Sequence, residues 1–424
     1  MGIISLKKRL VHILRWSERY TKTDMVYFAS GNFWLITSRV IGVGSGVLLT
    51  IAFANLISPT AFGTYKYILS IAGIIGAFSL TGLNHAVMRA VAQGNTSVIH
   101  VAFRINMMWS VPASLLALMG GIYYFVQGNV ILATGLALIA LTNPFLNSFI
   151  FSKSLLIGLQ KFKVNALYNV PRSLIPVSSL IIVLFLSENI ILIILTYFLS
   201  NLIAGIITYK LAVNKYAKKS DQSVENIALT NEVVTYGKHL SVVGIITQIA
   251  GYIDQFLLWH FVGPIQLAIY IFALAPVREI KNFSENFFPL IFPKFAVKTR
   301  ESIKEVMPLR LKQVFIFSAI MAGLYILAAP LIFRVFFPQY LSSVLGSQLL
   351  ALAIILQPKG LIDVFITAHG RVKERYVYTI TTSVSRIILL AILIPLYGFM
   401  GAIFATITAE IISAMVLLIL YRRM

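Results

Sequence analysis

Long apolar stretches, separated by short polar ones, run along the whole chain. A helix needs roughly 20 mostly apolar residues to cross the hydrocarbon layer of a membrane. Stretches of this kind lie near residues 29–56, 64–88, 101–126, 130–157, 164–187, 190–212, 239–262, 265–292, 312–335, 344–368, 374–397 and 400–421. The sequence therefore predicts an all-α, polytopic membrane protein with about twelve transmembrane helices.

The composition supports this prediction. Hydrophobic residues make up 58% of the 424 residues and charged residues only 12%, whereas about a quarter of the residues of a soluble protein are charged. The formal net charge is +21, which in a soluble protein would indicate nucleic-acid binding. In a membrane protein the cytoplasmic loops collect Lys and Arg, so we expect no nucleic-acid partner.

The loops between the expected spans alternate in charge. One set is basic: the N-terminus, Arg89 to Arg104, Lys161 with Lys163, Lys210 to Lys238, Lys294 to Lys312, Arg371 to Arg375, and Arg422 with Arg423. The other set is short and nearly uncharged: Ser58-Pro59, Gln127 to Asn129, Ser187 to Asn189, Gly263-Pro264, Pro338-Gln339 and Tyr397-Gly398. Because basic loops lie in the cytoplasm, this alternation predicts that both termini are cytoplasmic.

The longest polar stretch divides the chain into two sets of six expected spans. We expect a basic amphipathic segment at 1–28, an N-lobe at 29–213, a cytoplasmic linker at 214–238 and a C-lobe at 239–424. Pro59 and Tyr65 recur as Pro264 and Tyr270 at one common offset, which indicates a duplicated six-helix unit. Transporters built from such pseudo-symmetric lobes bind their substrate between the repeats and work by alternating access.

Charged residues within the expected spans are the candidate functional residues, because a charge in the bilayer is costly unless it faces a bundle interior or a cavity. The span 265–292 carries Arg278, Glu279, Lys281 and Glu285. At 100° per residue Arg278, Lys281 and Glu285 share one stripe. We favour a cavity-lining site for this cluster; the alternative is a Lys281–Glu285 bridge that only orders the bundle.

Four further arginines join Arg278 and Lys281 as candidates for a cationic, substrate-binding cavity: Arg39, Arg89, Arg172 and Arg386. Arg172 and Arg386 lie well within their spans on polar faces. Arg39 either lines the cavity or extends to the membrane surface, and Arg89 lies near the inner end of a span, where a plain topology signal is the alternative.

Four carboxylates are candidates for coupling transport to H⁺ or Na⁺: Asp254, Glu279, Glu285 and Glu410. Burial favours the neutral form of a carboxylic acid unless a cation compensates, so such groups can take up and release ions.

Motifs for catalysis are missing from the sequence. It contains no cysteine and no Walker-type phosphate-binding motif, and we find no His/Glu metal box and no Ser/His/Asp constellation. We therefore expect no catalytic residue, no metal site, no nucleotide and no cofactor, and a transporter rather than an enzyme. Embedded cations outnumber embedded anions, which favours an anionic substrate such as a phosphate or diphosphate.

The stretch from residue 30 to 90 resembles the opening of a known family. The resemblance is carried by Gly31 to Trp34, Ser38-Arg39, Leu49 to Ala54, Ser58 to Tyr65 and Gly82 to Arg89. These segments resemble the polysaccharide transport family, the Wzx-type O-antigen and capsule flippases of the multidrug/oligosaccharidyl-lipid/polysaccharide superfamily. Arg39 and Arg89 belong to the matched stretch, whereas the other candidate cations match no family motif.

The resemblance implies a flippase in the cytoplasmic membrane of a bacterium or archaeon. Its substrate would be an undecaprenyl-diphosphate-linked oligosaccharide, which it moves from the inner to the outer leaflet for surface polysaccharide synthesis, driven by ion gradients. Its partners would be the lipid-diphosphate oligosaccharide, membrane lipids and polysaccharide polymerase or assembly proteins.

Three other functions compete with this one. A multidrug or organic cation antiporter of the same fold predicts an acidic, aromatic-lined cavity, and the sign of the embedded charge argues against it. A membrane enzyme such as a glycosyltransferase needs a sizeable catalytic loop, which the sequence lacks. A non-transporting scaffold of an assembly complex leaves the charge at Arg278 unexplained.

Overall fold

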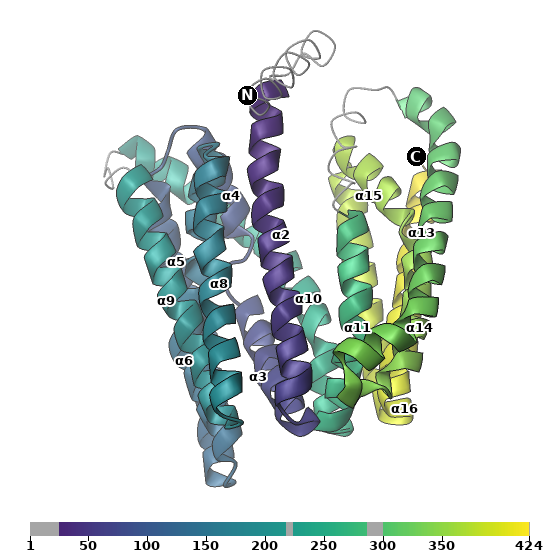
Figure 1. The fold of residues 1–424 in the computed structure, drawn as a ribbon. Helices are drawn as coiled ribbons and strands as arrows, with labels where there is room; N and C mark the ends of the chain where they lie inside the picture. Colours follow the sequence, from purple (N-terminus) through teal and green to yellow (C-terminus); the bar gives the residue numbers. More distant parts are fainter. Residues whose placement is uncertain (1–24, 218–223, 286–299, 424) are drawn as a thin grey trace, which may run out of the picture. The chain divides into compact units, whose positions relative to one another are not determined.

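The structure, a computed structural model, describes residues 25–217, 224–285 and 300–423. Most of the expected basic segment 1–28 lies outside these residues. The described residues are almost entirely helical, and no strand occurs among them (Figure 1). The predicted all-α architecture is confirmed.

The helices follow the apolar stretches of the sequence. In chain order they are α2 (Met25–Leu56), α3 (Pro59–Ala77), α4 (Leu83–Ala92), α5 (Val98–Val126), α6 (Val130–Ser148), α7 (Phe151–Gly158), α8 (Phe162–Leu186), α9 (Ile190–Tyr216), α10 (Val224–Phe261), α11 (Pro264–Glu285), α13 (Arg300–Phe336), α14 (Ser343–Ala351), α15 (Lys359–Ala368) and α16 (Val372–Arg422), with 3₁₀ turns η1 (Pro338–Tyr340) and η2 (Leu352–Leu356). Among the described residues, eight helices are long and apolar enough to cross a membrane, or nine if the bent pair Ser343–Leu356 and Lys359–Ala368 forms one span.

Three of the expected spans are interrupted. The stretch 64–88 divides into α3 and α4, the stretch 130–157 into α6 and α7, and the stretch 344–368 into α14, η2 and α15. By contrast, α10 is longer than the span expected there, because it begins at Val224, inside the stretch expected to be a linker. Polar residues do not prevent a helix from continuing beyond the membrane, so a drop in hydropathy marks the edge of the lipid and not the end of the helix.

Helix α16 is a helical hairpin made of the last two expected spans. Gly398 has φ 56° and ψ −130°, values outside the helical region, and glycine reaches a positive φ without the clash that a Cβ causes. A Cβ placed on Gly401 would lie 1.9 Å from the carbonyl oxygen of Leu393. Residues eight apart in a continuous helix are separated by about 12 Å, so the chain folds back on itself at Gly398.

The chain divides into two compact units. Unit 1 comprises residues 1–50, 82–115 and 138–238, and unit 2 comprises 51–81, 116–137 and 239–424. The last segment of unit 2 begins at residue 239, where the C-lobe is expected to begin, but residues 51–81 and 116–137 of the expected N-lobe also fall in unit 2. The division into pseudo-symmetric lobes, like the cytoplasmic position of the termini, stays a prediction.

Unit 2 is held together by close approaches between its helices. A Cβ on Gly63 of α3 would lie 1.9 Å from the carbonyl oxygen of Pro264 at the start of α11. Beside this contact the ring of Phe272 lies 4.8 Å from that of Phe62 and 3.9 Å from that of Tyr340, measured between centroids. This aromatic core fixes α11, the helix that carries Lys281, within unit 2.

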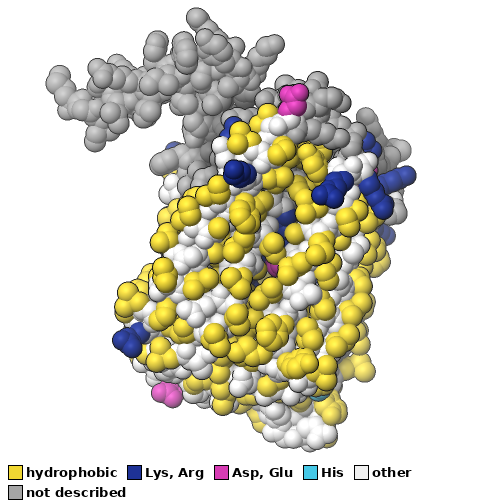
Figure 2. All heavy atoms as spheres, turned by 90° about the vertical axis from the view of Figure 1, so that its right-hand side faces the viewer, with side chains coloured by type: hydrophobic (Ala, Val, Ile, Leu, Met, Phe, Trp, Pro, Cys, Tyr) yellow, Lys and Arg dark blue, Asp and Glu magenta, His cyan; other side chains and the backbone are white. Residues whose placement is uncertain are grey.

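Apolar side chains cover most of the molecular face in Figure 2, and Lys and Arg gather near one end of that face. Helix α13 contributes a row of exposed large side chains: Phe315, Ile320, Leu324, Leu327 and Leu331. An apolar surface of this extent is far larger than soluble monomers expose. It suits a surrounding of lipid, in agreement with the predicted polytopic membrane protein.

The hairpin makes a testable prediction about Gly401. We expect Gly401→Ala to destabilise the protein by about 2 kcal/mol or more, because the new methyl group overlaps the Leu393 carbonyl and forces the two arms of α16 apart. Thermal unfolding of the purified protein in detergent measures the effect. Gly323→Ala in α13 is the matched control, since a Cβ there meets nothing within 4 Å. Equal melting temperatures for the two variants would contradict the hairpin.

Candidate functional site

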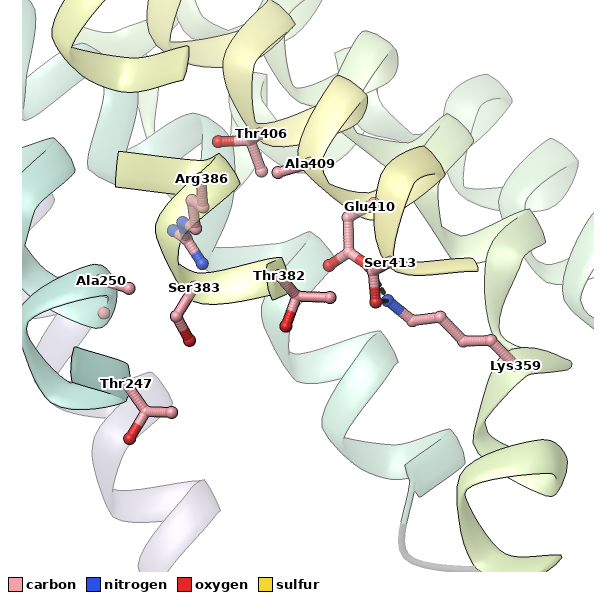
Figure 3. A pocket seen from close by; sticks show the side chains of 11 residues that line it. Thr247, Ala250, Lys359, Thr382, Ser383, Arg386, Thr406, Ala409, Glu410 and Ser413 are labelled. Atoms are coloured by element: carbon pink, nitrogen blue, oxygen red, sulfur yellow. Dashed lines mark hydrogen bonds and ion pairs between the residues drawn. The ribbon is translucent and has the colours of Figure 1, made fainter. Parts of the chain in front are cut away.

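A polar cavity of about 190 Å³ lies within unit 2 between α10, α15 and the two arms of α16 (Figure 3). Three ionisable side chains line it, Lys359, Arg386 and Glu410. The other lining residues are small or carry hydroxyl groups: Thr247, Ala250, Gly251, Thr382, Ser383, Thr406, Ala409 and Ser413. The cavity is therefore a candidate binding site for a charged or strongly polar group.

Helical spacing places the lining residues of α16 on facing stripes. On the first arm Arg386 lies three residues after Ser383 and four after Thr382; on the second arm Ala409 and Glu410 lie three and four residues after Thr406, and Ser413 lies three residues after Glu410. Residues at these spacings share one face of a helix. Because the chain reverses at Gly398, the two stripes can line the same space. The small residues of α10 leave room for it.

A fully paired carboxylate forms one side of the site. The Asp254 side chain of α10 is 0% exposed. Its Oδ2 accepts hydrogen bonds from Nη2 of Arg386 at 3.1 Å and from the Tyr270 hydroxyl at 3.0 Å, and its Oδ1 accepts one from the backbone N–H of Gln255 at 2.8 Å. The Tyr270 hydroxyl also lies 3.2 Å from the Thr406 hydroxyl. A buried charge of this kind is tolerated because it is paired and hydrogen-bonded.

A second carboxylate, Glu410, lies between two lysines. Lys281 of α11 donates to its Oε1 and Lys359 of α15 donates to its Oε2. Lys359 also donates to the Ser413 hydroxyl at 2.8 Å, which lies 3.0 Å from the Tyr378 hydroxyl. The side chains of Lys281, Lys359 and Glu410 remain 21%, 19% and 19% exposed. In contrast to Asp254, this group is accessible from the cavity.

The charges of the site do not cancel. Arg386 balances Asp254, whereas Lys281 and Lys359 together face the single carboxylate of Glu410. The Nε of Arg386 is buried without a hydrogen-bond partner among the described residues. The site thus carries an excess positive charge, an unused N–H donor and several hydroxyl groups, which together suit an anionic ligand.

The structure brings together four of the ten predicted site residues, Lys281, Arg386, Asp254 and Glu410, in this one site. Arg278 of α11 is exposed and interacts electrostatically with Lys66 of α3. Glu279 is half-buried and does not line the cavity. The side chain of Glu285 lies outside the described part of the structure, so the expected Lys281–Glu285 bridge stays untested there; the described partner of Lys281 is Glu410.

The other three predicted cations belong to unit 1. Arg39 on α2 and Arg89 on α4 are exposed. Arg172 on α8 is half-buried and its Nη1 donates to the carbonyl oxygen of Phe149 at 3.2 Å. Their part in substrate binding stays a prediction.

Sequence reasoning missed Lys359, although the signal that identified the other candidates was present. Lys359 is a lone cation inside the expected span 344–368, beside Pro358 and Gly360. Tyr270 and Thr406 had no such signal, because a hydroxyl group within an apolar stretch is ordinary. Within the described residues, His, Asp and Glu do not gather in any group of three or more that could hold a metal ion.

Comparisons with known proteins agree with this description. The model of a family described as "Polysaccharide biosynthesis protein" matches residues 28–296, more than half of the chain. None of the curated proteins compared with the chain matches it significantly.

Solved structures of similar fold are transporters. The lipid II flippase MurJ in an inward closed conformation is 17% identical, with a TM-score of 0.61 over 92% of this chain and 87% of that chain. An inward-facing multidrug resistance transporter of the MATE family, MOP superfamily, is 14% identical, with a TM-score of 0.60 over 93% of this chain and 97% of that chain. A MOP superfamily transporter from Pyrococcus furiosus, described by the reverse polarity of its binding pocket, is 14% identical, with a TM-score of 0.58 over 93% and 95%.

The Asp254–Arg386 pair makes a prediction about stability. We expect Asp254→Asn to lower the free energy of unfolding by about 3 kcal/mol, because it leaves the Arg386 guanidinium without its charge partner. The double variant Asp254→Asn/Arg386→Gln should recover part of this loss, since no unpaired charge remains.

A double-mutant cycle of thermal unfolding in detergent measures the coupling between the two residues. Glu374→Gln is the control, because Glu374 pairs with Arg371 on a more exposed part of α16. Additive effects of the two single substitutions would show that the pair does not contribute to stability.

Proposed function

The chain belongs to the polysaccharide biosynthesis protein family, and on this premise we propose that it is a flippase for lipid-linked oligosaccharides. Its substrate is an undecaprenyl-diphosphate-linked oligosaccharide, which crosses from the inner to the outer leaflet of the cytoplasmic membrane for surface polysaccharide synthesis. The fold of the chain is that of MOP superfamily transporters. The lipid-linked substrate of the flippase neighbour supports the substrate class.

The observation that carries the proposal is the excess of positive charge in the cavity of unit 2. Lys359, Arg386 and Glu410 line the cavity, and Lys281 and Asp254 are paired with these lining residues. Opposite unit charges 4 Å apart attract by about 4 kcal/mol at an effective dielectric constant of 20, against about 1 kcal/mol in water. A diphosphate in this cavity would therefore be held strongly, while water-exposed lysines would hold it weakly.

In this mechanism the cavity binds the diphosphate and alternating access moves it across the membrane. Lys281 and Lys359 contact the phosphoryl oxygens, and the Arg386 guanidinium and the Ser413 hydroxyl line the same cavity. The prenyl chain remains in the lipid, because its transfer to a polar cavity would cost about 0.8 kcal/mol for each CH₂ group. An ion gradient drives the cycle, and Glu410 lines the cavity in which the diphosphate binds.

An organic cation antiporter is the second candidate, favoured by the likeness to multidrug transporters. It needs a carboxylate that is free to bind a cation. Both carboxylates of the site are already paired, Asp254 with Arg386 and Glu410 with two lysines. A ligand cation would have to displace one of these fixed cations, so the charge of the site favours the flippase.

The proposal is tested by transport in proteoliposomes. We expect the wild type to move a fluorescent undecaprenyl-diphosphate oligosaccharide between leaflets, detected by loss of protection from a membrane-impermeant quencher. Lys281→Gln and Lys359→Gln should each slow flipping by about tenfold or more, because each removes one charge that faces the diphosphate. Lys373→Gln is the matched control, since Lys373 is an exposed lysine of α16 outside the cavity.

Two other results would contradict parts of the proposal. If folded wild type flips none of several lipid-diphosphate glycans under imposed H⁺ or Na⁺ gradients, but exports organic cations, the antiporter is correct. Flipping at the wild-type rate by both lysine variants would instead move the anion site away from this cavity.

A further inference from the structure

Glu410 occupies the place between the two lysines that an anionic ligand would take. One carboxylate oxygen contacts Lys281 and the other contacts Lys359. Two phosphoryl groups of a diphosphate present their oxygens to two cations in the same way. Each of the three side chains is about one-fifth exposed, so the carboxylate is not sealed in place as Asp254 is.

The positive charges of Lys281 and Lys359 balance the two negative charges of a diphosphate only when Glu410 is neutral. A diphosphate diester, which links a lipid to a sugar, carries one negative charge on each phosphoryl group. Lys281 and Lys359 supply two positive charges, but the Glu410 carboxylate cancels one of them. With an ionised Glu410 in the group, the bound diester would leave a net negative charge inside the membrane, which is costly.

We propose that Glu410 is a built-in counter-ion for Lys281 and Lys359, which the lipid diphosphate displaces and which takes up one proton as it leaves. The inference rests on the proposed function, because it takes the diphosphate diester as the ligand. The proton that Glu410 gains in the loaded state restores charge balance in the site. When Glu410 loses this proton, its carboxylate competes for the lysines again and expels the ligand.

The displaced state leaves the neighbouring groups satisfied. Lys359 keeps its hydrogen bond to the Ser413 hydroxyl, which lies within hydrogen-bonding distance of Tyr378. The neutral acid of Glu410 needs no counter-ion and can remain in the polar cavity that it lines. Exchange of one anion for another therefore avoids a stage with two unpaired lysines, which the membrane would oppose.

The other charged groups around Glu410 have partners of their own, and two of them also act on this group: Arg386 interacts electrostatically with Glu410, and Asp363 with Lys359. On α10, Asp254 accepts hydrogen bonds from Arg386 and from Tyr270 of α11. On α15, Asp363 lies one turn beyond Lys359 and interacts electrostatically with Lys359 and Arg375. Helices α14 and η2 also pack against α16 and contain no ionisable side chain. Glu410 lines the cavity and contacts both lysines, so its protonation directly changes the charge offered to a ligand.

Binding measurements on the detergent-solubilised protein test this inference. The probe is farnesyl diphospho-N-acetylglucosamine, a short diphosphate diester, titrated between pH 6 and pH 8. We expect wild-type affinity to fall as the pH rises, by at most tenfold per pH unit, because one proton is taken up with the ligand. Glu410→Gln should bind roughly tenfold tighter or more at pH 8 and lose the pH dependence, since the competing carboxylate is gone.

Glu374→Gln is the matched control and should retain the wild-type affinity and pH profile, because Glu374 pairs with Arg371 outside the cavity. Unchanged or weaker binding by folded Glu410→Gln, with the wild-type pH profile, would overturn the inference.

A second measurement needs no variant, in case Glu410→Gln does not fold. Calorimetric titration of wild type in buffers of different ionisation enthalpy gives the number of protons taken up with the probe. We expect about one proton near neutral pH, and no uptake would overturn the inference. A wild type that flips the long-chain substrate but shows no uptake refutes the role of Glu410 alone. A wild type that neither binds the probe nor flips the substrate refutes the proposed function with it.

Discussion

A charge placed in the hydrocarbon layer must have a partner, and this requirement shapes the centre of unit 2. Transfer of an unpaired ion from water into a medium of low dielectric constant costs several kcal/mol or more. The two carboxylates of the site meet this requirement through three cations, contributed by α11, α15 and α16. The same pairs connect segments that are 132 and 129 residues apart in the sequence. Charge pairing therefore constrains which helices of the unit lie together, in addition to the apolar packing of Phe62, Phe272 and Tyr340.

The two charge groups differ in accessibility, which indicates that the buried group stabilises the fold and, in the proposed function, the exposed group binds the ligand. Asp254 is fully buried and uses both of its oxygens, one for Arg386 and Tyr270 and the other for a backbone N–H. A ligand cannot reach it without breaking several bonds at once. Glu410 has two partners of its own but lies on the cavity wall. The hairpin at Gly398 brings both groups together, with Arg386 of the buried pair on the first arm of α16 and Glu410 on the second.

The sequence was sufficient for the type of fold and for many of the charged residues, because both follow from the cost of burial in lipid. Apolar length predicted the spans, and the turn at Tyr397-Gly398 separated the two arms of α16. Breaks such as the one between α3 and α4 were not predictable, since a hydropathy window averages over local bends. The sequence also could not predict which charged residues pair with each other. Helical spacing indicated Glu285 as the partner of Lys281, whereas Lys281 on α11 contacts Glu410 on α16. Long-range pairing depends on tertiary packing, which a single helix does not encode.

A fold shared at 14–17% identity with drug transporters and a lipid flippase does not decide the cargo. The charge of the site is the evidence for the substrate, and the sequence alone overstates the excess of positive charge in that site. Of the six cations expected in a cavity, Lys281 and Arg386 reach this site, and Lys359 joins them. After pairing, the excess is a single positive charge. One fixed charge gives modest attraction for a dianion and permits release, whereas three unpaired cations would trap it. Transport needs both binding and release. A site whose cations are mostly paired with its own carboxylates before the substrate binds is therefore better suited to a transporter than a site with unpaired cations.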